Sequence, residues 1–507
     1  MVGVINFGGQ YAHLIARRLR ELGVKSELIS PDVKIDRLKK MNPQALIFSG
    51  SPYSVYEKNA PKIDPKVYNL GLPILGICYG HQLMAYQLGG KVASHQAKQY
   101  GKEDLEVIKR SPLFQALSKK ETVWFSHGDH VDDLPKGFVV IAQTKNSKIA
   151  AMQNQSLNFY GIQFHPEVTH TTGGMKILQN FLFKISKAKK DWSLPQVKEQ
   201  IIKETKKQIG DSKVLMAISG GVDSLVAATL LKEAVGKNLY PVFIDTGLLR
   251  AYDVADFEDI LKKVKFENVV IVKAEERFLK VLKGVVDPEE KRAKIAKLYF
   301  EILEEEAKKI GKVLYLAQGT IYPDRIESAA PTKHADKIKS HHNVTLPHGL
   351  KLKIIEPLAD LYKDEVRKLG KLLNLPDEFL NRHPFPGPGL AIRILGEVTK
   401  ERLDIVARSD EIFISELKST GIYAKVAQSL TALLPVKSVG VMGDARTYSY
   451  IIALRSVDTL DFMTADWSKI PSEVLEKISS RIVNEVRGIN RVVYDITQKP
   501  PATIEYE

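Results

Sequence analysis

Cysteine is almost missing from this chain, because only one of its 507 residues, Cys78, carries a thiol. A single cysteine excludes an internal disulfide framework, and a free thiol fits a reducing compartment better than an oxidising one. The sequence also lacks any apolar run near the roughly 18 residues of a membrane-spanning helix, and no basic leader precedes the short apolar run at its start. We therefore expect an unprocessed cytoplasmic protein without a membrane partner.

The charged residues leave a basic excess, with 74 lysines and arginines against 60 aspartates and glutamates and a net charge of +14. Such an excess suits nucleic acid, anionic small molecules or simply a lysine-rich cytosol, so charge alone does not choose a partner. A hydrophobic fraction of 44% can fill several buried cores. At about 150 residues per domain, the length predicts about three domains.

Short apolar runs alternate with helical periodicity, which predicts two consecutive α/β domains with mainly parallel sheets. We place the first at residues 1–186 and the second at 193–382, with the lysine-rich stretch 184–195 as the connector. A segment rich in proline and glycine, 382–393, marks the next boundary. Residues 383–507 mix long helical patterns with strand-like runs, which predicts a smaller α+β domain.

The lone thiol stands in the stretch GICYGHQ, residues 76–82, directly after the apolar run Pro73–Leu75. A strand, the pattern G-x-C-x-G and a following helix make the cysteine form of a nucleophile elbow, in which glycines permit a tight turn that lifts the reactive atom clear of the sheet. The N-terminus of the helix, which we expect near His81, favours a thiolate. The other interpretation is a small buried core cysteine, the commonest role of a free cysteine.

A base for the thiol stands in Phe-His-Pro-Glu at 164–167, again directly after an apolar run. His165 and Glu167 are two residues apart, so on an extended segment the carboxylate can orient the imidazole that deprotonates the thiol. Backbone N–H groups of Gly50 and Tyr79 can stabilise the oxyanion that forms on attack. All of these groups follow predicted strands, at the sheet edge where open α/β sheets bind ligands.

GICYGHQ and FHPE, together with SHGD at 126–129, resemble the class I, triad-type glutamine amidotransferases over about residues 1–185. The resemblance implies that Cys78 attacks the side-chain amide of glutamine, forms a glutamyl thioester and releases ammonia. Many relatives carry Gly-Gly-Pro in the oxyanion region, where this chain has Gly50-Ser51-Pro52. That change leaves the donated backbone N–H in place.

Residues 219–224 read SGGVDS and lie between an expected strand, Lys213–Ile218, and an apolar helix. Two glycines let successive amides turn toward one point, and the helix dipole adds positive potential, so the loop can cradle a phosphate. A generic tight turn between strand and helix is the other interpretation. No lysine follows in the G-K-[ST] manner, which excludes the Walker loop.

The string SGGVDS resembles the pyrophosphatase loop (PP-loop) of enzymes with an adenine nucleotide hydrolase-like fold, which split ATP between its α and β phosphates. The resemblance implies that the departing pyrophosphate is held by Ser219, Gly220, Gly221, Val222, Asp223, Ser224 and Leu225. Pyrophosphate needs charge neutralisation to leave, so we expect Mg²⁺ with ATP, held in part by Asp223, and no organic cofactor. The polar stretch 334–343 is either a solvated loop or a lid whose Lys339 closes on phosphates.

Several strings resemble the family of glutamine-hydrolysing GMP synthases: QGTIYPD at 318–324, RHPFPGPGL at 382–390, VGVMGDART at 439–447 and KPPATIEYE at 499–507. The resemblance implies an ATP-driven amination of XMP to GMP through adenylyl-XMP, with AMP, pyrophosphate and glutamate as the other products. It also implies a homodimer formed through the C-terminal domain. It places XMP against Arg277, Gln428, Lys499, Ile504 and Glu505. For the last residues of the chain, a frayed and solvated end is the other interpretation.

Three alternatives stand beside this hypothesis. A related enzyme that aminates another acceptor, in the synthesis of NAD or asparagine, is disfavoured by the C-terminal strings. A PP-loop tRNA-modifying, RNA-binding protein would suit the charge of +14. However, RNA thiolation usually needs further cysteines, so we expect no nucleic-acid partner. A binding module with degenerate sites is disfavoured because Cys78, His165, Glu167 and the whole loop are intact.

Overall fold

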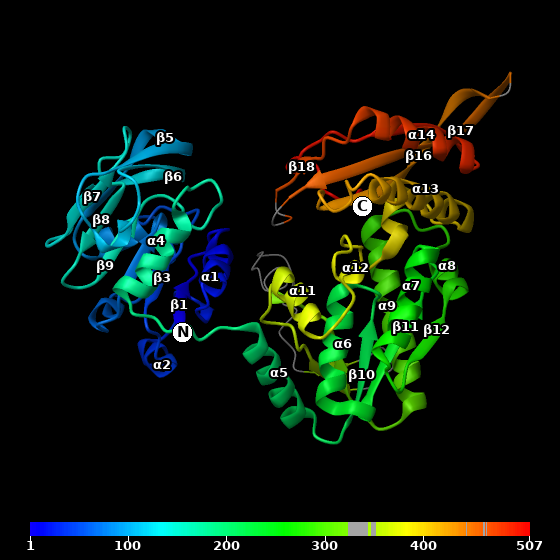
Figure 1. Ribbon diagram of the computed structural model, residues 1–507, viewed down its shortest axis with the longest axis horizontal. Coiled ribbons are helices and arrows are strands. Elements are labelled where there is room, and N and C mark those ends of the chain that lie inside the picture. The colour runs from blue at the N-terminus through cyan, green and yellow to red at the C-terminus, as the bar shows by residue number, and fades with distance from the viewer. Residues whose placement is uncertain (323–342, 346–350, 443, 460–461, 463) are drawn as a thin grey trace. The chain divides into compact units, whose positions relative to one another are not determined.

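The computed structural model describes residues 1–322, 343–345, 351–442, 444–459, 462 and 464–507. These residues divide into two compact units, Met1–Ser193 and Leu194–Glu507 (Figure 1). Within the described ranges, none of the helices combines the length and the apolar character that a bilayer crossing needs.

A nine-stranded sheet forms the centre of the first unit, in the order β2-β1-β3-β4-β9-β8-β7-β5-β6. The strands from β2 to β9 in this order pair in parallel, and the pairings from β9 to β6 are antiparallel. In chain order the strands are β1 Val2–Ile5, β2 Ser26–Ile29, β3 Leu46–Phe48, β4 Ile74–Ile77, β5 Lys91–Val107, β6 Lys120–Asp133, β7 Val139–Gln143, β8 Ala151–Asn154 and β9 Phe159–Ile162.

Helices cover both faces of this sheet. Neighbouring residues of β3 point to opposite faces: Ile47 belongs to one apolar cluster, and Leu46 and Phe48 belong to the other. The cluster around Ile47 also contains apolar residues of α1 and α4, while that around Leu46 contains those of α2 and α3. These helices are α1 Ala12–Glu21, α2 Ile35–Met41, α3 Tyr79–Gln87 and α4 Gly174–Asn180, and a π-helical turn, Phe181–Ile185, continues α4.

The first part of the second unit contains a sheet whose described strands have the order β12-β11-β10-β13-β15-β14 and are parallel except for β14. Its strands are β10 Lys213–Ile218, β11 Leu239–Asp245, β12 Val270–Lys273, β13 Val313–Ala317, β14 Asn343–Thr345 and β15 Lys351–Ile355. Its helices are α5 Leu194–Ile209, α6 Val222–Val235, α7 Ala251–Val264, α8 Glu275–Leu282, α9 Pro288–Ile310, α11 Lys363–Leu372 and α12 Asp377–Leu380.

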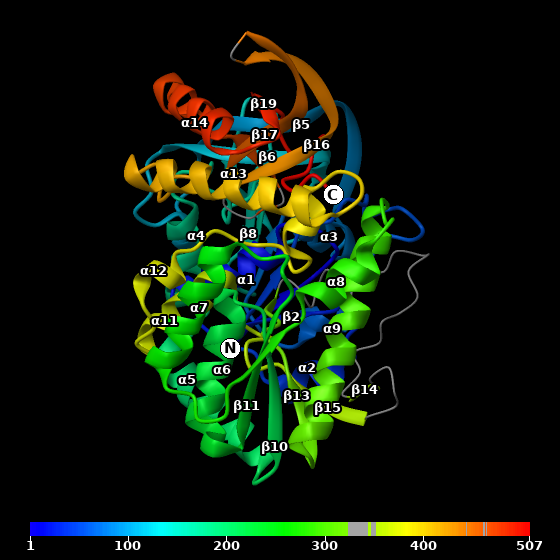
Figure 2. The same ribbon diagram turned by 90° about the vertical axis from the view of Figure 1, so that its right-hand side faces the viewer.

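The last part of the second unit is a smaller sheet with two helices. Strands β16 (Gln428–Met442) and β17 (Ala445–Asp458) form a long hairpin, to which β18 (Asp466–Trp467) adds antiparallel and β19 (Ile489–Tyr494) adds parallel. Helices α13 (Lys400–Ser419) and α14 (Ser472–Glu485) pack side by side against this sheet (Figures 1 and 2). A 3₁₀ turn, Gly389–Arg393, precedes α13.

Two α/β series followed by an α+β region confirm the predicted fold class. The strand Val313–Ala317 has the bounds expected from the sequence, but helix α3 begins at Tyr79, two residues before the expected His81. The antiparallel half of the first sheet was not predicted. The boundary at 382 stays a prediction, because one apolar cluster contains residues from both sides of it, such as Ile302 and Ile452.

Candidate active sites

Cys78 occupies a sharp turn between β4 and α3, with φ of 54° and ψ of −109°. The turn brings backbone segments so close that its glycines cannot carry side chains. A Cβ atom on Gly76 would lie 2.5 Å from the carbonyl oxygen of Gly80, and one on Gly80 would lie 2.4 Å from that of Phe48. The Cys78 N–H donates to Ile162 O of β9 at 2.9 Å. The pattern G-x-C-x-G therefore forms the elbow expected of it.

His165 and Glu167 form a buried pair beside this elbow. The Nδ1–H of His165 donates to Oε1 of Glu167 at 2.7 Å, and the two side chains are 4% and 0% exposed. Burial alone would lower the pKa of His165, but the carboxylate of Glu167 and the sulfur of Cys78 outweigh it and raise the pKa to about 10. The structure thus brings the three expected residues together and favours an imidazolium next to the sulfur.

The backbone of Gly50 borders the same point. A Cβ atom placed on it would lie 3.3 Å from Cε1 of His165 and 3.9 Å from Cβ of Cys78. The preceding residue fixes this loop, because Ser49 O accepts a hydrogen bond from the Gly80 N–H at 3.0 Å. Tyr79 is the first residue of α3, where backbone N–H groups have no intrahelical acceptor. Both expected oxyanion donors therefore lie at the elbow.

Arg18 of helix α1 and Tyr11, the residue directly before that helix, support the site, and no sequence signal could have revealed either of them. The Nε–H of Arg18 donates to the carbonyl oxygen of Glu167 at 3.0 Å. The ring of Tyr11 meets that of His165 edge-on, with centroids 5.0 Å apart. Both side chains hold the segment that carries the imidazole and the carboxylate.

Histidines buried in the same unit have the opposite charge state. Burial lowers the pKa of His81 and of His127 to about 3, so both are neutral at physiological pH. His81 lies so close to β9 that a Cβ on Gly161 would be 2.3 Å from its Nδ1. Of these three buried imidazoles, His165 is the one that stays protonated at neutral pH, because it pairs with the carboxylate of Glu167.

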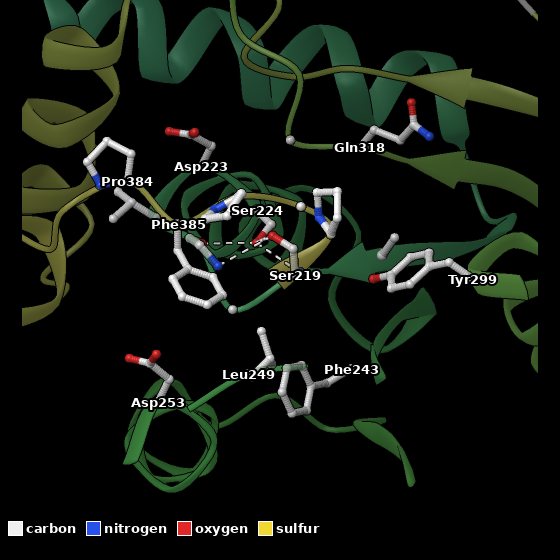
Figure 3. Close-up of a pocket in the computed structure, with 18 of the residues that line it drawn as sticks. Ser219, Asp223, Ser224, Phe243, Leu249, Asp253, Tyr299, Gln318, Pro384 and Phe385 are labelled. Carbon is white, nitrogen blue, oxygen red and sulfur yellow. Dashed lines mark hydrogen bonds between the residues drawn. The ribbon is translucent and has the colours of Figure 1, made fainter. Parts of the chain in front are cut away.

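The glycine-rich loop of the second unit borders a pocket of about 720 Å³ (Figure 3). The hydroxyls of Ser219 and Ser224 lie 3.2 Å apart, and the Ser224 Oγ also accepts from the Ser219 N–H at 3.2 Å. Gly220 has a φ of +81°, as the tight turn requires. Leu225 does not contribute its side chain to the pocket, because it is fully buried in the packing of α6.

The pocket combines cationic and apolar side chains. Its cations are Arg250, Arg292, Lys363 and Arg382. Lys363, at the start of α11, donates to both oxygens of Asp223 at 2.7 and 2.6 Å. No sequence pattern predicts this pair, whose members stand 140 residues apart. Phe243 and Leu249 provide an apolar side, where Figure 3 shows them next to each other. The expected lid residue, Lys339, lies outside the described residues.

The segment 382–388 forms a wall of this pocket. The prolines and glycines of this segment predicted a domain boundary, and its string RHPFPGPGL resembles the GMP synthases, but neither observation predicted a pocket wall. His383 stacks on Tyr423 with ring centroids 3.7 Å apart, and its backbone N–H donates to the Tyr423 hydroxyl at 2.9 Å. These contacts fix the irregular segment, so that Phe385 borders the pocket.

The residues that the resemblance assigned to XMP fall into separate groups. Gln428 Nε2 donates to Oε1 of Glu505 at 2.8 Å, and Ile504 packs in an apolar cluster that includes Leu430 and Ala432 of β16. The ammonium group of Lys499 donates to the carbonyl oxygen of Phe462 at 2.8 Å. The described contacts do not bring Arg277 to this group, because its guanidinium forms two hydrogen bonds of 2.8 Å with Glu305.

Arg292 joins the pocket to the end of the chain. Its side chain lines the pocket, and its Nη2–H donates to the carbonyl oxygen of Glu507 at 2.7 Å. The buried ammonium group of Lys291 also forms an ion pair with the side-chain carboxylate of Glu507. The segment after Ile504 is therefore attached to α9 at the edge of the pocket, rather than frayed.

The elbow, the imidazole–carboxylate pair and the mixed sheet define the first unit as a class I glutamine amidotransferase domain. The family model described as "Glutamine amidotransferase class-I" matches residues 3–185, and the model described as "GMP synthase C terminal domain" matches residues 415–506.

The GMP synthase [glutamine-hydrolyzing] of Aquifex aeolicus is 52% identical over 505 residues, which cover 99% of each chain. Those of Thermosipho melanesiensis and Clostridium novyi are 52% and 51% identical and cover 100% of this chain and 99% of theirs. This chain belongs to the family of glutamine-hydrolysing GMP synthases.

Proposed function

We propose that this protein is the ligase that makes GMP from XMP, with glutamine as the nitrogen donor and ATP as the energy source. The observation that carries this function is the likeness to glutamine-hydrolysing GMP synthases over 99% of both chains. The pairing of a cysteine elbow with a PP-loop in one chain supports it, because the first can release ammonia and the second can activate an acceptor.

Glutamine hydrolysis is assigned to Cys78, His165 and Glu167. The sulfur attacks the carboxamide carbon of glutamine, and the N–H groups of Gly50 and Tyr79 stabilise the resulting oxyanion. His165 gives its proton to the departing nitrogen, so that ammonia leaves and a glutamyl thioester remains. Water, deprotonated by the same imidazole, then cleaves the thioester to glutamate and returns the thiol.

XMP activation is assigned to the pocket of the second unit. The acceptor oxygen of XMP attacks the α-phosphate of ATP, which forms adenylyl-XMP and releases pyrophosphate. The loop Ser219–Ser224 and the pocket cations hold the negative charge that develops on the leaving pyrophosphate. Ammonia then replaces the AMP group. Phe243 and Leu249 offer an apolar surface for the adenine ring.

Magnesium would neutralise pyrophosphate charge in this reaction. In the described part of the chain, no cluster of three or more histidine, cysteine or acidic side chains could hold a metal ion by itself. That arrangement fits Mg²⁺ delivered with ATP, because magnesium usually takes one or two carboxylates and leaves its other positions to phosphates and water. Asp223, whose carboxylate already binds the Lys363 cation, is the residue that would hold it.

XMP recognition is assigned to Arg277, Gln428, Lys499, Ile504 and Glu505. Arg277 would exchange its ion pair with Glu305, whose members are 42% and 43% exposed, for the ligand. A lysine can pair with the 5′-phosphate, while a carboxylate can accept hydrogen bonds from the purine ring. Lys499 and Glu505 are the residues with those groups. Gln428 supports the carboxylate through their shared hydrogen bond.

The proposed partner is a second copy of the chain. The β16–β17 hairpin extends beyond the sheet to which it belongs (Figure 1), and it leaves Val439, Val441 and Tyr448 at 50%, 76% and 68% exposure. Apolar side chains gathered in this way mark a protein interface. We also place the protein in the cytoplasm, because its free thiol needs reducing conditions, and we propose no nucleic-acid partner.

The two reactions should be coupled, because free ammonia is mostly protonated at neutral pH and ammonium is not a nucleophile. We expect XMP and ATP together to stimulate glutamine hydrolysis. Equal glutaminase turnover with and without these ligands would contradict the coupling.

The deciding experiment supplies purified protein with XMP, MgATP and glutamine and measures GMP. Cys78→Ala should make no GMP from glutamine but should still use added ammonium salt. GMP formation from glutamine by this variant would refute the role of Cys78. If the wild-type protein made no GMP from either nitrogen source, the proposed activity itself would be wrong, and salt-sensitive tRNA binding would then favour the RNA-binding alternative.

A further inference from the structure

A chain of charged side chains joins the pocket to Glu505. Arg250 on the pocket wall donates from Nη1 to Oδ2 of Asp410 at 2.7 Å. The other oxygen of Asp410, Oδ1, lies 3.6 Å from Nη1 of Arg393. Arg393 in turn donates from Nε and Nη2 to the two oxygens of Glu505, at 3.0 Å each. One carboxylate, that of Asp410, therefore lies between a pocket cation and the arginine that holds Glu505.

The centre of this chain is shielded from water. The side chains of Asp410 and Arg393 are 0% and 1% exposed, so their charges interact with little screening. The carboxylate is fixed to the C-terminal sheet, because Oδ1 of Asp410 accepts a hydrogen bond from the Thr431 N–H of β16 at 2.8 Å. A buried charge without a partner is strongly unfavourable, so a change at one end must be compensated along the chain.

One nitrogen of the Arg393 guanidinium can still donate a hydrogen bond. Its Nη1 is buried and makes no hydrogen bond within the described residues, although Asp410 lies 3.6 Å away. The competing attraction on Asp410 comes from Arg250, whose hydrogen bond to it is nearly an ångström shorter. Asp410 therefore binds Arg250 more closely than Arg393. Loss of the Arg250 hydrogen bond would leave the Asp410 carboxylate to interact with Arg393.

Phe385 connects both arginines to the pocket. Its ring centroid lies 4.7 Å from the guanidinium carbon of Arg250 and 4.9 Å from that of Arg393. The ring itself lines the pocket, where Figure 3 shows it beside the glycine-rich loop. Both arginines are therefore held at cation–π distance from one pocket side chain.

We propose that Asp410 is a positioning residue that couples nucleotide binding in this pocket to XMP binding at Glu505. The inference rests on the proposed function, which puts ATP and XMP at these two places. Phosphates in the pocket compete for Arg250. Asp410, released from that partner, binds Nη1 of Arg393, and Arg393 relaxes its hold on Glu505. The carboxylate oxygens of Glu505 then become acceptors for the purine, so ATP tightens XMP binding, and XMP tightens ATP binding by the same factor.

The test measures the dissociation constant of XMP by calorimetry, with and without the magnesium complex of an ATP analogue whose α–β bridge is a methylene group. In the wild-type protein the analogue should tighten XMP binding at least about fivefold. In Asp410→Asn the factor should fall below about twofold. The matched control is Glu416→Gln on the same helix, whose carboxylate pairs with Lys477 and Arg481 at 2.9 and 2.8 Å. It should keep the wild-type factor.

A second variant keeps the test independent of the folding of Asp410→Asn. Arg250→Gln removes the charged side chain at the pocket end of this series and leaves Arg393 and Glu505 in place. It too should lose the coupling factor. Retention of the wild-type factor in either variant, or equal XMP affinity with and without the analogue in the wild-type protein, would overturn the proposal. Failure of the wild-type protein to bind XMP at all would overturn the proposed function as well, and GMP formation distinguishes the two cases.

Discussion

Replacing Glu167 with glutamine tests how the proposed glutaminase site is organised. The change keeps the size of the side chain but removes the charge that holds the proton on His165. The hydrogen bond that loses its charged acceptor is short, at 2.7 Å, and buried, and hydrogen bonds to charged groups contribute about 1.5–3 kcal/mol. At about 1.4 kcal/mol per factor of ten, glutamine-dependent turnover should fall about 10- to 150-fold.

The pKa of His165 gives a second readout of the same variant. The Glu167 carboxylate is one of the two groups that raise this pKa to about 10, so Glu167→Gln should let His165 lose its proton at a lower pH. Alkylation of the thiol by iodoacetamide across pH 6–10 would follow the change, and the label can only report on Cys78, because no other cysteine exists. The alkaline part of the profile should shift toward neutral pH.

The control for this experiment is Glu27→Gln, which changes an exposed carboxylate on β2 of the same sheet. It should leave both readouts unchanged, and ammonium-dependent GMP synthesis should stay at the wild-type rate in both variants. A loss of less than threefold in Glu167→Gln, or an equal loss with ammonium as the nitrogen source, would refute the assigned role of the carboxylate.

Three further predictions concern packing, pH and assembly. Gly80→Ala puts a Cβ 2.4 Å from the carbonyl oxygen of Phe48 and should lower the free energy of unfolding by about 1–3 kcal/mol; an unchanged urea midpoint would contradict it. Burial lowers the pKa of His81 and His127 from 6.5 to about 3. The stability that each neutral histidine contributes is therefore complete above pH 6.5 and is lost as the pH falls toward 3, by about 5 kcal/mol each. The urea midpoint should therefore drop between pH 7 and pH 5, and a flat profile would argue against neutral buried histidines. Tyr448→Glu should convert a dimer to monomers in light scattering, and an unchanged mass would exclude this hairpin as the interface.

The stretches proposed to be catalytic could be recognised in the sequence because each is local. GICYGHQ specifies strand, turn and helix within seven residues, and the two glycines are required by backbone contacts that any side chain would block. Helix α3 still begins earlier than expected, because the Cys78 carbonyl already accepts from the N–H groups of His81 and Gln82. The side chain of the N-cap residue, Cys78, makes no capping hydrogen bond, so the usual sequence signal for a helix start is missing here.

The partners of these stretches could not be predicted, because they come from distant positions. Lys363 meets Asp223 across 140 residues, and Arg250 meets Asp410 across 160. A lysine or aspartate on the surface of a helix has the same local sequence as one that faces a pocket. Proline-rich 382–388 was likewise recognised as irregular, but only tertiary packing shows that irregular backbone lines the site.

The apolar cluster that contains both Ile302 and Ile452 has a practical consequence for dissecting the protein. A cut near residue 382 would divide that cluster and expose its interior on both fragments, so neither fragment is a sound object for separate expression. A cut after Ser193 respects the compact units. A synthetase half supplied with ammonium salt should therefore start at Leu194 and retain every residue that follows.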